Sequence, residues 1–198
     1  MILPEESEPA SLAPGTVIAN RYVIERKLGE GGMGQVYQAT QVNLRRDVAL
    51  KLLHGNLPDH EAGRRRFIRE ARVAAALRHP SAVEIYDVGM DGPHVFIVME
   101  LLTGMVLRDL VLSEHRLPLA DALELTVQIA DLLVTAHAIP LVHRDLKPEN
   151  IFVEHDREGR LRARVVDFGL AFIEGDAETG RLTREGLVVG TPAFLAPE

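Results

Sequence analysis

The sequence predicts an α+β fold, with strands in its first part and a long helix in its second part. Two observations predict it. In the first part, short apolar runs such as Tyr22-Val23-Ile24 alternate with glycine-rich turns, which is typical of strands in hairpins. In the second part, the stretch from Leu119 to His137 repeats apolar residues at helical spacing.

The stretch 119–137 predicts an amphipathic core helix rather than a membrane span. Its apolar positions keep the helical period at residues 123, 126, 127, 130, 133 and 134. It also carries four polar or charged side chains, Asp121, Glu124, Gln128 and Asp131. Residues 1–14 are rich in Pro, Glu, Ala and Ser and lack a secretory signal. We therefore expect a disordered lead-in over residues 1–20 and a cytoplasmic protein without a membrane segment.

Composition excludes several kinds of site. The net charge of −7, from 22 basic and 29 acidic residues, argues against nucleic acid as a main partner. The chain has no cysteine, which excludes disulfides and thiolate metal sites. Its histidines are scattered without the spacing of zinc ligands.

Two carboxylates, an amide and an ammonium lie close together in the stretch from His143 to Asn150 and in Asp167-Phe168-Gly169. Each motif alone is common at surfaces and in turns. Between them, Ile151-Phe152-Val153 and Leu161 to Val166 predict a hairpin with a turn at residues 156–159. A hairpin brings its ends together, so Asn150 and Asp167 are expected to face one space. Their oxygens suit Mg²⁺ held largely by phosphates.

The glycines at 29, 31 and 34 follow the spacing G-x-G-x-x-G within the run from Leu28 to Val36. Dinucleotide-binding folds use the same spacing, but there the glycines lead from a strand into a helix. Here they lie between two apparent strands, 22–24 and 36–37. In that position they let backbone N–H groups approach phosphate oxygens.

Val48-Ala49-Leu50-Lys51 predicts a third strand, with Ala49 and Lys51 on one face by alternation. Alone, Lys51 would be interpreted as a lysine that extends from a strand into solvent. Glu70, on the apolar face of a predicted helix, needs a partner because a carboxylate on an inward face is costly. Arg66 on the same helix and Lys51 are the two candidates.

In this order and spacing, the motifs over residues 21–198 resemble the bacterial-type, eukaryotic-like serine/threonine protein kinase family. The resemblance implies the bilobal protein-kinase-like fold: a complete N-lobe of five strands and one helix over residues 21–100, a hinge over residues 101–104, and a partial helical C-lobe over residues 105–198. The C-lobe stops after Ala196-Pro197-Glu198. Lys147, two residues after Asp145, and Gly190-Thr191-Pro192 resemble the serine/threonine branch.

The resemblance implies ATP and Mg²⁺ as cofactors and protein Ser/Thr hydroxyls as acceptors. Asp145 would accept the proton of the substrate hydroxyl, and Lys147 would neutralise charge on the transferred group. Asn150 and Asp167 would hold Mg²⁺.

For the nucleotide, the resemblance implies that Lys51 grips the α- and β-phosphates and is locked by Glu70. Backbone groups of Glu100 and Leu102 would bind adenine, and Met99 would guard the back of the pocket. The implied nucleotide-binding residues are Leu28, Gly29, Gly31, Gly34, Val36, Ala49, Lys51, Met99, Glu100, Leu102 and Phe152.

His143 and Phe168 are expected to be structural, packed in a stack with Ile85. The chain departs from the family pattern at Ala74, which is small for that stack, and at Phe194, where many relatives have Tyr.

The segment 173–188 resembles an activation loop. Arg144, beside Asp145, would bind a phosphate on that loop, with autophosphorylation at Thr183 as the first candidate and Thr179 as the second. Glu185 would already supply part of the negative charge.

Three functions remain to be separated: an active kinase, an ATP-binding pseudokinase or regulatory scaffold, and a dinucleotide-binding module. Every catalytic position of the first is filled. The resemblance also implies missing C-lobe helices, which would leave a poor catalyst. Without those helices, the chain would expose the side chains of Leu123, Val127, Ala130 and Leu133 and would self-associate through them.

Overall fold

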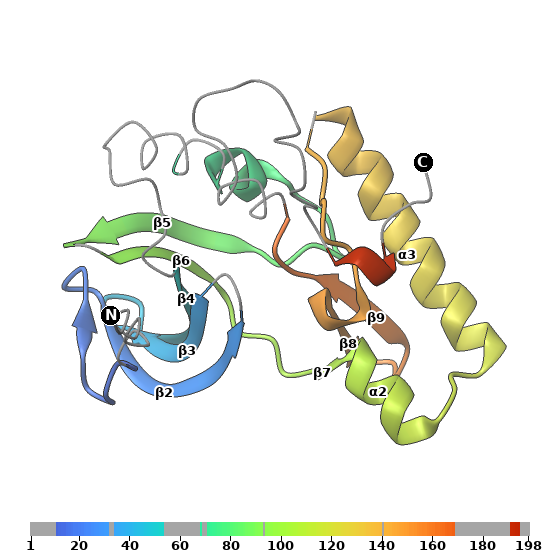
Figure 1. The fold of residues 1–198 in the computed structure, drawn as a ribbon, viewed down its shortest axis with the longest axis horizontal. Coiled ribbons are helices and arrows are strands. Elements are labelled where there is room, and N and C mark those ends of the chain that lie inside the picture. Colours follow the sequence, from blue (N-terminus) through green and yellow to red (C-terminus); the bar gives the residue numbers. More distant parts are fainter. Residues whose placement is uncertain are drawn as a thin grey trace, which may run out of the picture. The chain divides into compact units, whose positions relative to one another are not determined.

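The computed structural model describes residues 11–31, 34–53, 68, 71–92, 94–139, 141–168 and 191–194. The chain divides into two compact units. The first comprises residues 1–56 and 87–101, and the second comprises residues 57–86 and 102–198. Figure 1 labels most of the elements of both units.

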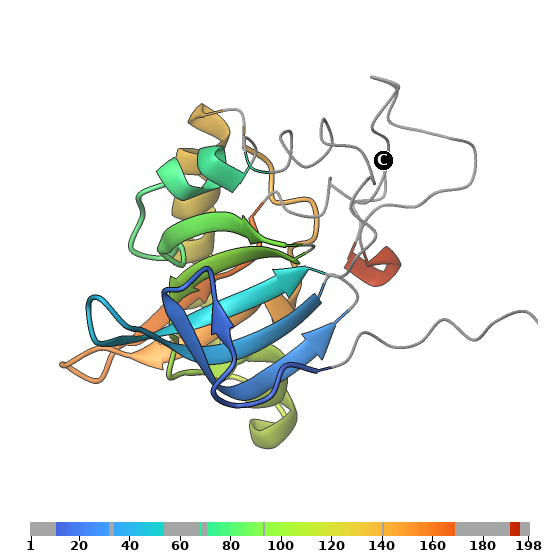
Figure 2. The ribbon, with the colours of Figure 1, turned by 90° about the vertical axis from the view of Figure 1, so that its left-hand side faces the viewer.

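The first unit is built on a six-stranded sheet with the strand order β1-β2-β3-β4-β6-β5. The strands are β1 (Val17–Ile18), β2 (Tyr22–Gly31), β3 (Gly34–Gln41), β4 (Arg46–Leu53), β5 (Ile85–Asp91) and β6 (His94–Glu100). The long strands lie side by side in Figure 2. The five expected strands are therefore present, and the short β1 adds a sixth.

Residues 11–20, which we expected to belong to a disordered lead-in, differ from that expectation. Val17 and Ile18 of β1 pair antiparallel with Val23 and Tyr22 of β2. The turn between these strands has Ala19 and Asn20 at positive φ, and the Ala19 N–H donates to Asp91 Oδ2 at 2.7 Å. Three residues, 19–21, separate the paired Ile18 and Tyr22, and composition alone does not reveal this hairpin.

The core of the first unit lies on one face of this sheet. Its fully buried side chains include Tyr22, Ile24, Tyr37, Leu50, Phe96 and Val98. The rings of Tyr22 and Phe96 meet edge to face with centroids 5.8 Å apart. The Tyr22 hydroxyl donates to Asp87 Oδ2 at 2.7 Å. Burial and this hydrogen bond raise the pKa of Tyr22 to about 12.

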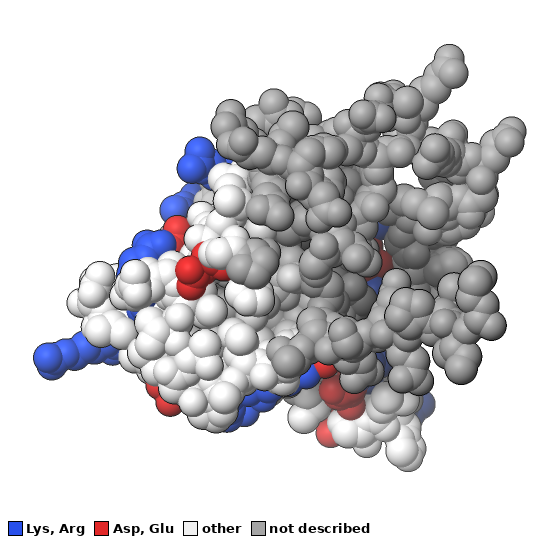
Figure 3. All heavy atoms as spheres, turned by 60° about the vertical axis from the view of Figure 1, so that its left-hand side comes forward, with Lys and Arg blue, Asp and Glu red and all other residues white. Residues whose placement is uncertain are grey.

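The outer surface of the first unit exposes several apolar side chains, Val17, Val42, Leu44 and Met90. On the side of the molecule that Figure 3 shows, the described atoms are mostly uncharged, with separate basic and acidic side chains around them. Isolated exposed apolar side chains are normal in folded proteins, so they carry no functional assignment.

The second unit combines helices with a small sheet of order β7-β8-β9. Its elements are β7 (Met105–Val106), α2 (Leu107–Glu114), α3 (Leu119–Ala138), η1 (Pro148–Asn150), β8 (Ile151–His155), β9 (Leu161–Val165) and η3 (Pro192–Phe194), and residues 71–76 are also helical. Strands β8 and β9 pair from Ile151↔Val165 to His155↔Leu161, which confirms the predicted hairpin.

The turn of this hairpin is fixed by one carboxylate. Asp156 Oδ1 accepts hydrogen bonds from the N–H groups of Glu158 and Arg160, each at 2.9 Å. Gly159 takes a φ of 78°, a region in which glycine is favoured. The turn therefore fixes the register that brings residues 150 and 166 to the open end of the hairpin.

The long helix α3 packs against β9. Its buried residues are Leu125, Leu132 and Ala136, with Ile129 and Leu133 packed against the same cluster. Leu123 and Val127 of the predicted stripe are 56% and 67% exposed, which agrees with the expectation that this stripe is uncovered. The side of α3 that faces β9 is a second apolar side, and the spacing used to predict the helix did not identify it. Within the described residues, no helix is long and apolar enough to cross a membrane.

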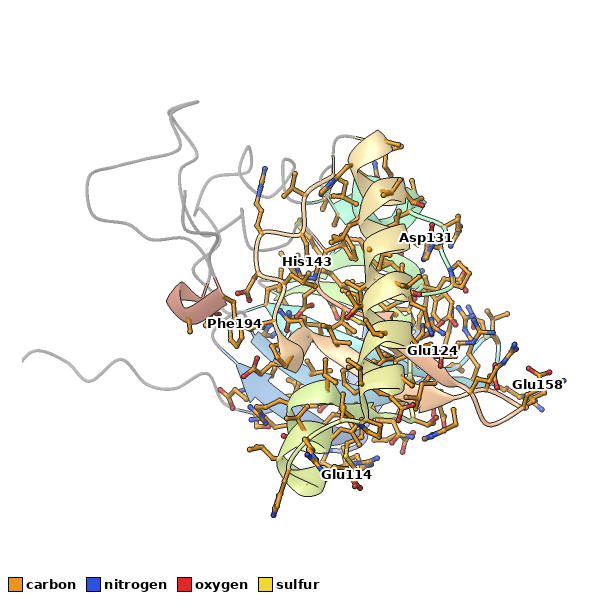
Figure 4. All side chains as sticks on the ribbon, turned by 90° about the vertical axis from the view of Figure 1, so that its right-hand side faces the viewer. Glu114, Glu124, Asp131, His143, Glu158 and Phe194 are labelled. Atoms are coloured by element: carbon orange, nitrogen blue, oxygen red, sulfur yellow. The ribbon has the colours of Figure 1, made fainter. Side chains whose placement is uncertain are left out.

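Gln128 of α3 binds the backbone of β9. Its Nε2 donates to Leu161 O at 2.9 Å, and its Oε1 accepts from Ala163 N at 3.0 Å. Both bonds satisfy backbone groups at the outer side of β9, where an unpaired group would be costly. Glu124, one turn earlier and labelled in Figure 4, is exposed.

We predict that Gln128→Met destabilises the protein by about 1–3 kcal/mol, because it keeps the side-chain volume and leaves two backbone groups of β9 without partners. Urea unfolding measures the change. Glu124→Met is the matched control, since a substitution at an exposed position changes stability by about 0.5 kcal/mol or less. Equal stability losses in the two variants would show that Gln128 does not hold β9.

Candidate active site

In the first unit, a set of residues shares the face of the sheet opposite the core. Cross-strand partners lie on one face, and Val36 pairs with Lys51 while Ala49 pairs with Met99. Tyr37 and Leu50, the adjacent pair, belong to the core face. The register therefore brings Val36, Ala49, Lys51 and Met99 together, as alternation predicted for Ala49 and Lys51. Lys51 is 5% exposed.

The glycine-rich segment joins β2 and β3, two antiparallel strands. This connection disfavours a dinucleotide-binding module, in which the glycines lead into a helix. A Cβ on Gly34, whose φ is 149°, would lie 2.0 Å from the carbonyl oxygen of Leu52, so only glycine fits there. A Cβ on Gly29 or Gly31 would meet nothing within 4 Å. These two glycines leave the backbone of β2 open to a ligand.

The predicted pairing of Lys51 with Glu70 falls partly outside the described residues, because Glu70 is among those not described. The helical residues 71–76 that follow it place Ala71 and Ala74 in buried positions. The suggested phosphate acceptors Thr183 and Thr179, together with Glu185, also lie outside the described residues.

In the second unit, the carboxylate of Asp145 is held by three side chains and one backbone group. Its Oδ1 accepts from Thr191 Oγ1 at 2.9 Å and from Thr191 N at 3.2 Å. Its Oδ2 lies 2.7 Å from Lys147 Nζ and accepts from Asn150 Nδ2 at 3.2 Å. Lys147 Nζ also donates to Thr191 Oγ1 at 2.8 Å. The structure therefore brings Asp145, Lys147 and Asn150 together, with Thr191 as a fourth member.

These donors determine the charge of Asp145. Burial on its own raises the pKa of the carboxyl group, but hydrogen bonds from Lys147, Thr191 and Asn150 and the positive charge of Lys147 outweigh burial. The pKa of Asp145 is therefore below its ordinary value. The group is ionised at neutral pH and can accept a hydrogen bond from a hydroxyl group.

Asn150 links Asp145 to the start of the hairpin. Its Nδ2 donates to the backbone carbonyl oxygen of Asp145 at 2.8 Å. Its own backbone carbonyl oxygen accepts from Val166 N at 3.0 Å. Asp167 is the next residue, so the hairpin brings both predicted cation ligands to one end of the sheet. Asp167 and Arg144 have φ values of 63° and 67°. Positive φ is uncommon outside glycine and occurs often at functional sites.

His143 is structural, as expected. It is 2% exposed, and its ring packs edge to face on Phe168 with centroids 4.6 Å apart. Ile85 and Ala74 belong to the packing around Phe168. His143 Nδ1 accepts from Asp145 N at 3.3 Å, so Nε2 carries the proton and donates to Val166 O at 2.9 Å. Burial lowers the pKa of His143, which keeps the ring neutral. Figure 4 labels this residue.

The connection after β6 packs on β8 within the second unit. Thr103 N donates to Glu154 Oε1 at 3.0 Å. A Cβ on Gly104 would lie 2.3 Å from Val153 O, so the backbone can approach β8 this closely only at a glycine. Phe152, one of the nucleotide-binding residues that the resemblance implies, is half-buried on β8 and pairs with Val106 of β7.

Thr191 is the site residue that sequence reasoning missed. It lies 46 residues after Asp145, and its short motif was used only to choose between branches. Phe194, in the following turn, is 50% exposed. The signal for Thr191 was the Gly190-Thr191-Pro192 motif, but nothing local shows which side chain it meets.

A model described as "Protein kinase domain" matches residues 22–198. The chain is 43% identical over 189 residues to serine/threonine-protein kinase pkn2 of Myxococcus xanthus, covering 94% of this chain and 22% of that protein. It is 42% identical to the DNA damage-responsive serine/threonine-protein kinase RqkA of Deinococcus radiodurans, covering 94% and 27%. The solved kinase domain of Mycobacterium tuberculosis PknI matches with a TM-score of 0.71 at 32% identity, covering 81% of this chain and 64% of that one. The chain thus spans about a quarter of the length of these two curated relatives.

We predict that His143 makes stability depend on pH. Its folded pKa is lowered, so its contribution is complete above about pH 6.5, the usual unfolded value, and is lost as pH falls through the folded pKa. Measured from about pH 7.5 to about pH 5, the loss of melting temperature should be smaller in His143→Phe than in the wild type. Parallel losses in both proteins would contradict this assignment.

We predict that Thr191→Val lowers turnover by about tenfold or more, because removing one hydrogen bond to a charged group costs about 1.5–3 kcal/mol. Thr191→Ser keeps the hydroxyl and should retain most of the turnover. The measurement is phosphate transfer at saturating nucleotide. If the valine and serine variants lose turnover equally, the methyl group of Thr191 matters and its hydroxyl does not.

Proposed function

The chain belongs to the protein kinase family, and we propose that it transfers the γ-phosphoryl group of ATP to serine and threonine hydroxyls of proteins. The observation that carries the proposal is the carboxylate of Asp145, ionised and bounded by Lys147, Asn150 and Thr191. Serine/threonine specificity is supported by the names of the similar bacterial kinases.

Asp145 would orient the acceptor hydroxyl group. A carboxylate has about four lone-pair sites, and the four donors on Asp145 already account for them. A substrate hydroxyl group must therefore replace one donor. Lys147 is the best candidate, because its ammonium group would be drawn to the anionic γ-phosphate. Lys147 would then neutralise charge on the phosphoryl group while Asp145 accepts the proton.

Protein kinases use ATP with Mg²⁺, and the residues present fit such a cation. The side-chain nitrogen of Asn150 donates to Asp145. Asp167 follows Val166, whose N–H donates to the backbone carbonyl oxygen of Asn150. Amide and carboxylate oxygens are suitable Mg²⁺ ligands, especially when phosphates complete the shell. Among the described residues, no group of three or more His, Asp or Glu side chains could hold a metal without such help. The bound cation would neutralise charge on the phosphates.

Nucleotide binding would use residues of the first unit and of the connection after it, together with Glu70 and Phe152 of the second unit. Gly29, Gly31 and Gly34 would offer backbone N–H groups to phosphates, and Lys51 would bind the α- and β-phosphates with Glu70 as its partner. Adenine would be held by Leu28, Val36, Ala49, Met99, Glu100, Leu102 and Phe152.

The remaining proposals concern organisation and regulation. We propose an N-lobe over residues 21–100, a hinge over 101–104 and a C-lobe from 105, in a cytoplasmic protein. Arg144 would bind a phosphate on Thr183. Self-association would use the exposed apolar side of α3, where Leu123 and Val127 lie.

We predict that Asp145→Asn lowers phosphate transfer to a generic basic protein by about 10²-fold or more, because general-base and orienting effects are of that size. Affinity for ATP should stay within about twofold, since Asp145 is not a proposed nucleotide ligand. Transfer that survives this change would contradict the assignment of Asp145. A wild type that binds ATP and transfers no phosphate to any protein would favour the regulatory scaffold.

We predict that Asp167→Asn weakens nucleotide binding only when Mg²⁺ is present, because the substitution removes a charged cation ligand. Calorimetric titration with ATP, with and without Mg²⁺, measures the difference. Glu158→Gln is the control, because it also neutralises a carboxylate but lies exposed in the turn at the opposite end of the same hairpin. Equal affinities of wild type and Asp167→Asn under both conditions would exclude Asp167 as a magnesium ligand.

A further inference from the structure

The hydroxyl group of Tyr37 is buried beside the glycine-rich segment and has three partners. Tyr37 is 0% exposed and lies on β3, three residues after Gly34. Its oxygen lies 3.0 Å from Leu12 N, 3.2 Å from Ser11 Oγ and 2.5 Å from Gln35 Oε1. A phenol donates one hydrogen bond and accepts two. Leu12 N and Ser11 Oγ therefore donate to Tyr37, and Tyr37 donates to Gln35.

Two of these partners, Ser11 and Leu12, lie in a segment before residue 22, where the match to the protein kinase domain begins. This segment is anchored on β2 by two backbone hydrogen bonds. Gly15 N donates to Ile24 O at 2.7 Å, and Ile24 N donates to Thr16 O at 2.9 Å. A turn with Thr16 N donating to Ala13 O then directs residues 11–12 back to Tyr37. The segment is thus tied to both strands of the glycine hairpin, β2 and β3.

The third partner extends the network to the end of the hairpin. Gln35 is 5% exposed, and its Nε2 lies 3.4 Å from Glu30 Oε1. Glu30 pairs with Gln35 across the hairpin, and the next pair is Gly31 with Gly34. Glu30 also forms an ion pair with Lys27. Hydrogen bonds therefore run from Ser11 and Leu12 through Tyr37 and Gln35 to the strand that carries Gly29 and Gly31.

We propose that residues 11–12 position the glycine-rich segment for the phosphates of the nucleotide, through the Tyr37 hydroxyl group and Gln35. Tyr37 and Gln35 are then positioning residues, which act without touching the ligand. The inference rests on the proposed function, because it assumes that the glycines bind the phosphates of ATP. If the backbone N–H groups of the glycine-rich segment are already held in place, nucleotide binding does not have to order them, and the conformational entropy lost on binding is smaller.

The alternative is that Tyr37 is only a core tyrosine whose hydroxyl group happens to be satisfied. The first unit contains a matched residue for separating the two. Tyr22 is also 0% exposed on the core face, and its hydroxyl group binds Asp87 rather than the N-terminal segment. Tyrosine to phenylalanine at either position removes one buried hydroxyl group. Only Tyr37→Phe breaks the connection to the glycine hairpin.

The experiment measures dissociation constants for ATP with Mg²⁺ and for adenosine, which has no phosphates. In Tyr37→Phe, the constant for ATP should rise about fivefold, the equivalent of one hydrogen bond of about 1 kcal/mol, and that for adenosine should not change. Deleting residues 1–12 should give the same pattern, and combining it with Tyr37→Phe should add little. Tyr22→Phe should leave both constants unchanged.

Three outcomes would contradict the proposal. Unchanged ATP affinity in both Tyr37→Phe and the deletion overturns it. An equal weakening of ATP and adenosine also overturns it, since that indicates a general loss of packing. A wild type that binds adenosine and gains nothing from the phosphates of ATP contradicts the proposed function itself, and the positioning role then fails with it.

Discussion

The candidate site depends on a carboxylate that would be costly to enclose without partners. The Asp145 side chain is 10% exposed, and four hydrogen-bond donors surround it. Burial alone would favour its protonated form, which could not accept a proton. The ammonium of Lys147 and the hydroxyl of Thr191 reverse that preference. The same contacts fix the direction of the carboxylate, so charge and orientation have one physical cause.

Other parts of the second unit hold this group in place. Asn150 binds both the side chain and the backbone of Asp145, and its own carbonyl oxygen accepts from Val166. His143 binds the N–H of Asp145 and the carbonyl oxygen of Val166 through its two ring nitrogens. The loop and the end of the hairpin are therefore joined by two independent bridges. A shift of β9 would move the carboxylate, which makes the contact between Gln128 and β9 relevant to chemistry as well as stability.

Local patterns predicted individual elements, and the resemblance to protein kinases predicted the overall fold. The β8–β9 hairpin followed from two apolar runs and a turn, and the shared face of Ala49 and Lys51 followed from alternation. Contacts between distant segments could not be predicted this way. Thr191 binds Asp145 although 46 residues separate them in the sequence. The side of α3 that is buried depends on where β9 packs, and the helical period of the sequence does not show this. The short strand β1 has only two residues, too few for an alternating pattern to show in the sequence.

The most direct test of this account is the pKa of Asp145, measured by carbon NMR of the carboxyl group in the wild type and in Lys147→Met. The account predicts a value below the ordinary range in the wild type, since Lys147 is the principal stabilising partner of the charged form. In Lys147→Met the pKa should rise, because burial then acts with less opposition. An ordinary or raised pKa in the wild type, or the same value in both proteins, would contradict the central role of this interaction.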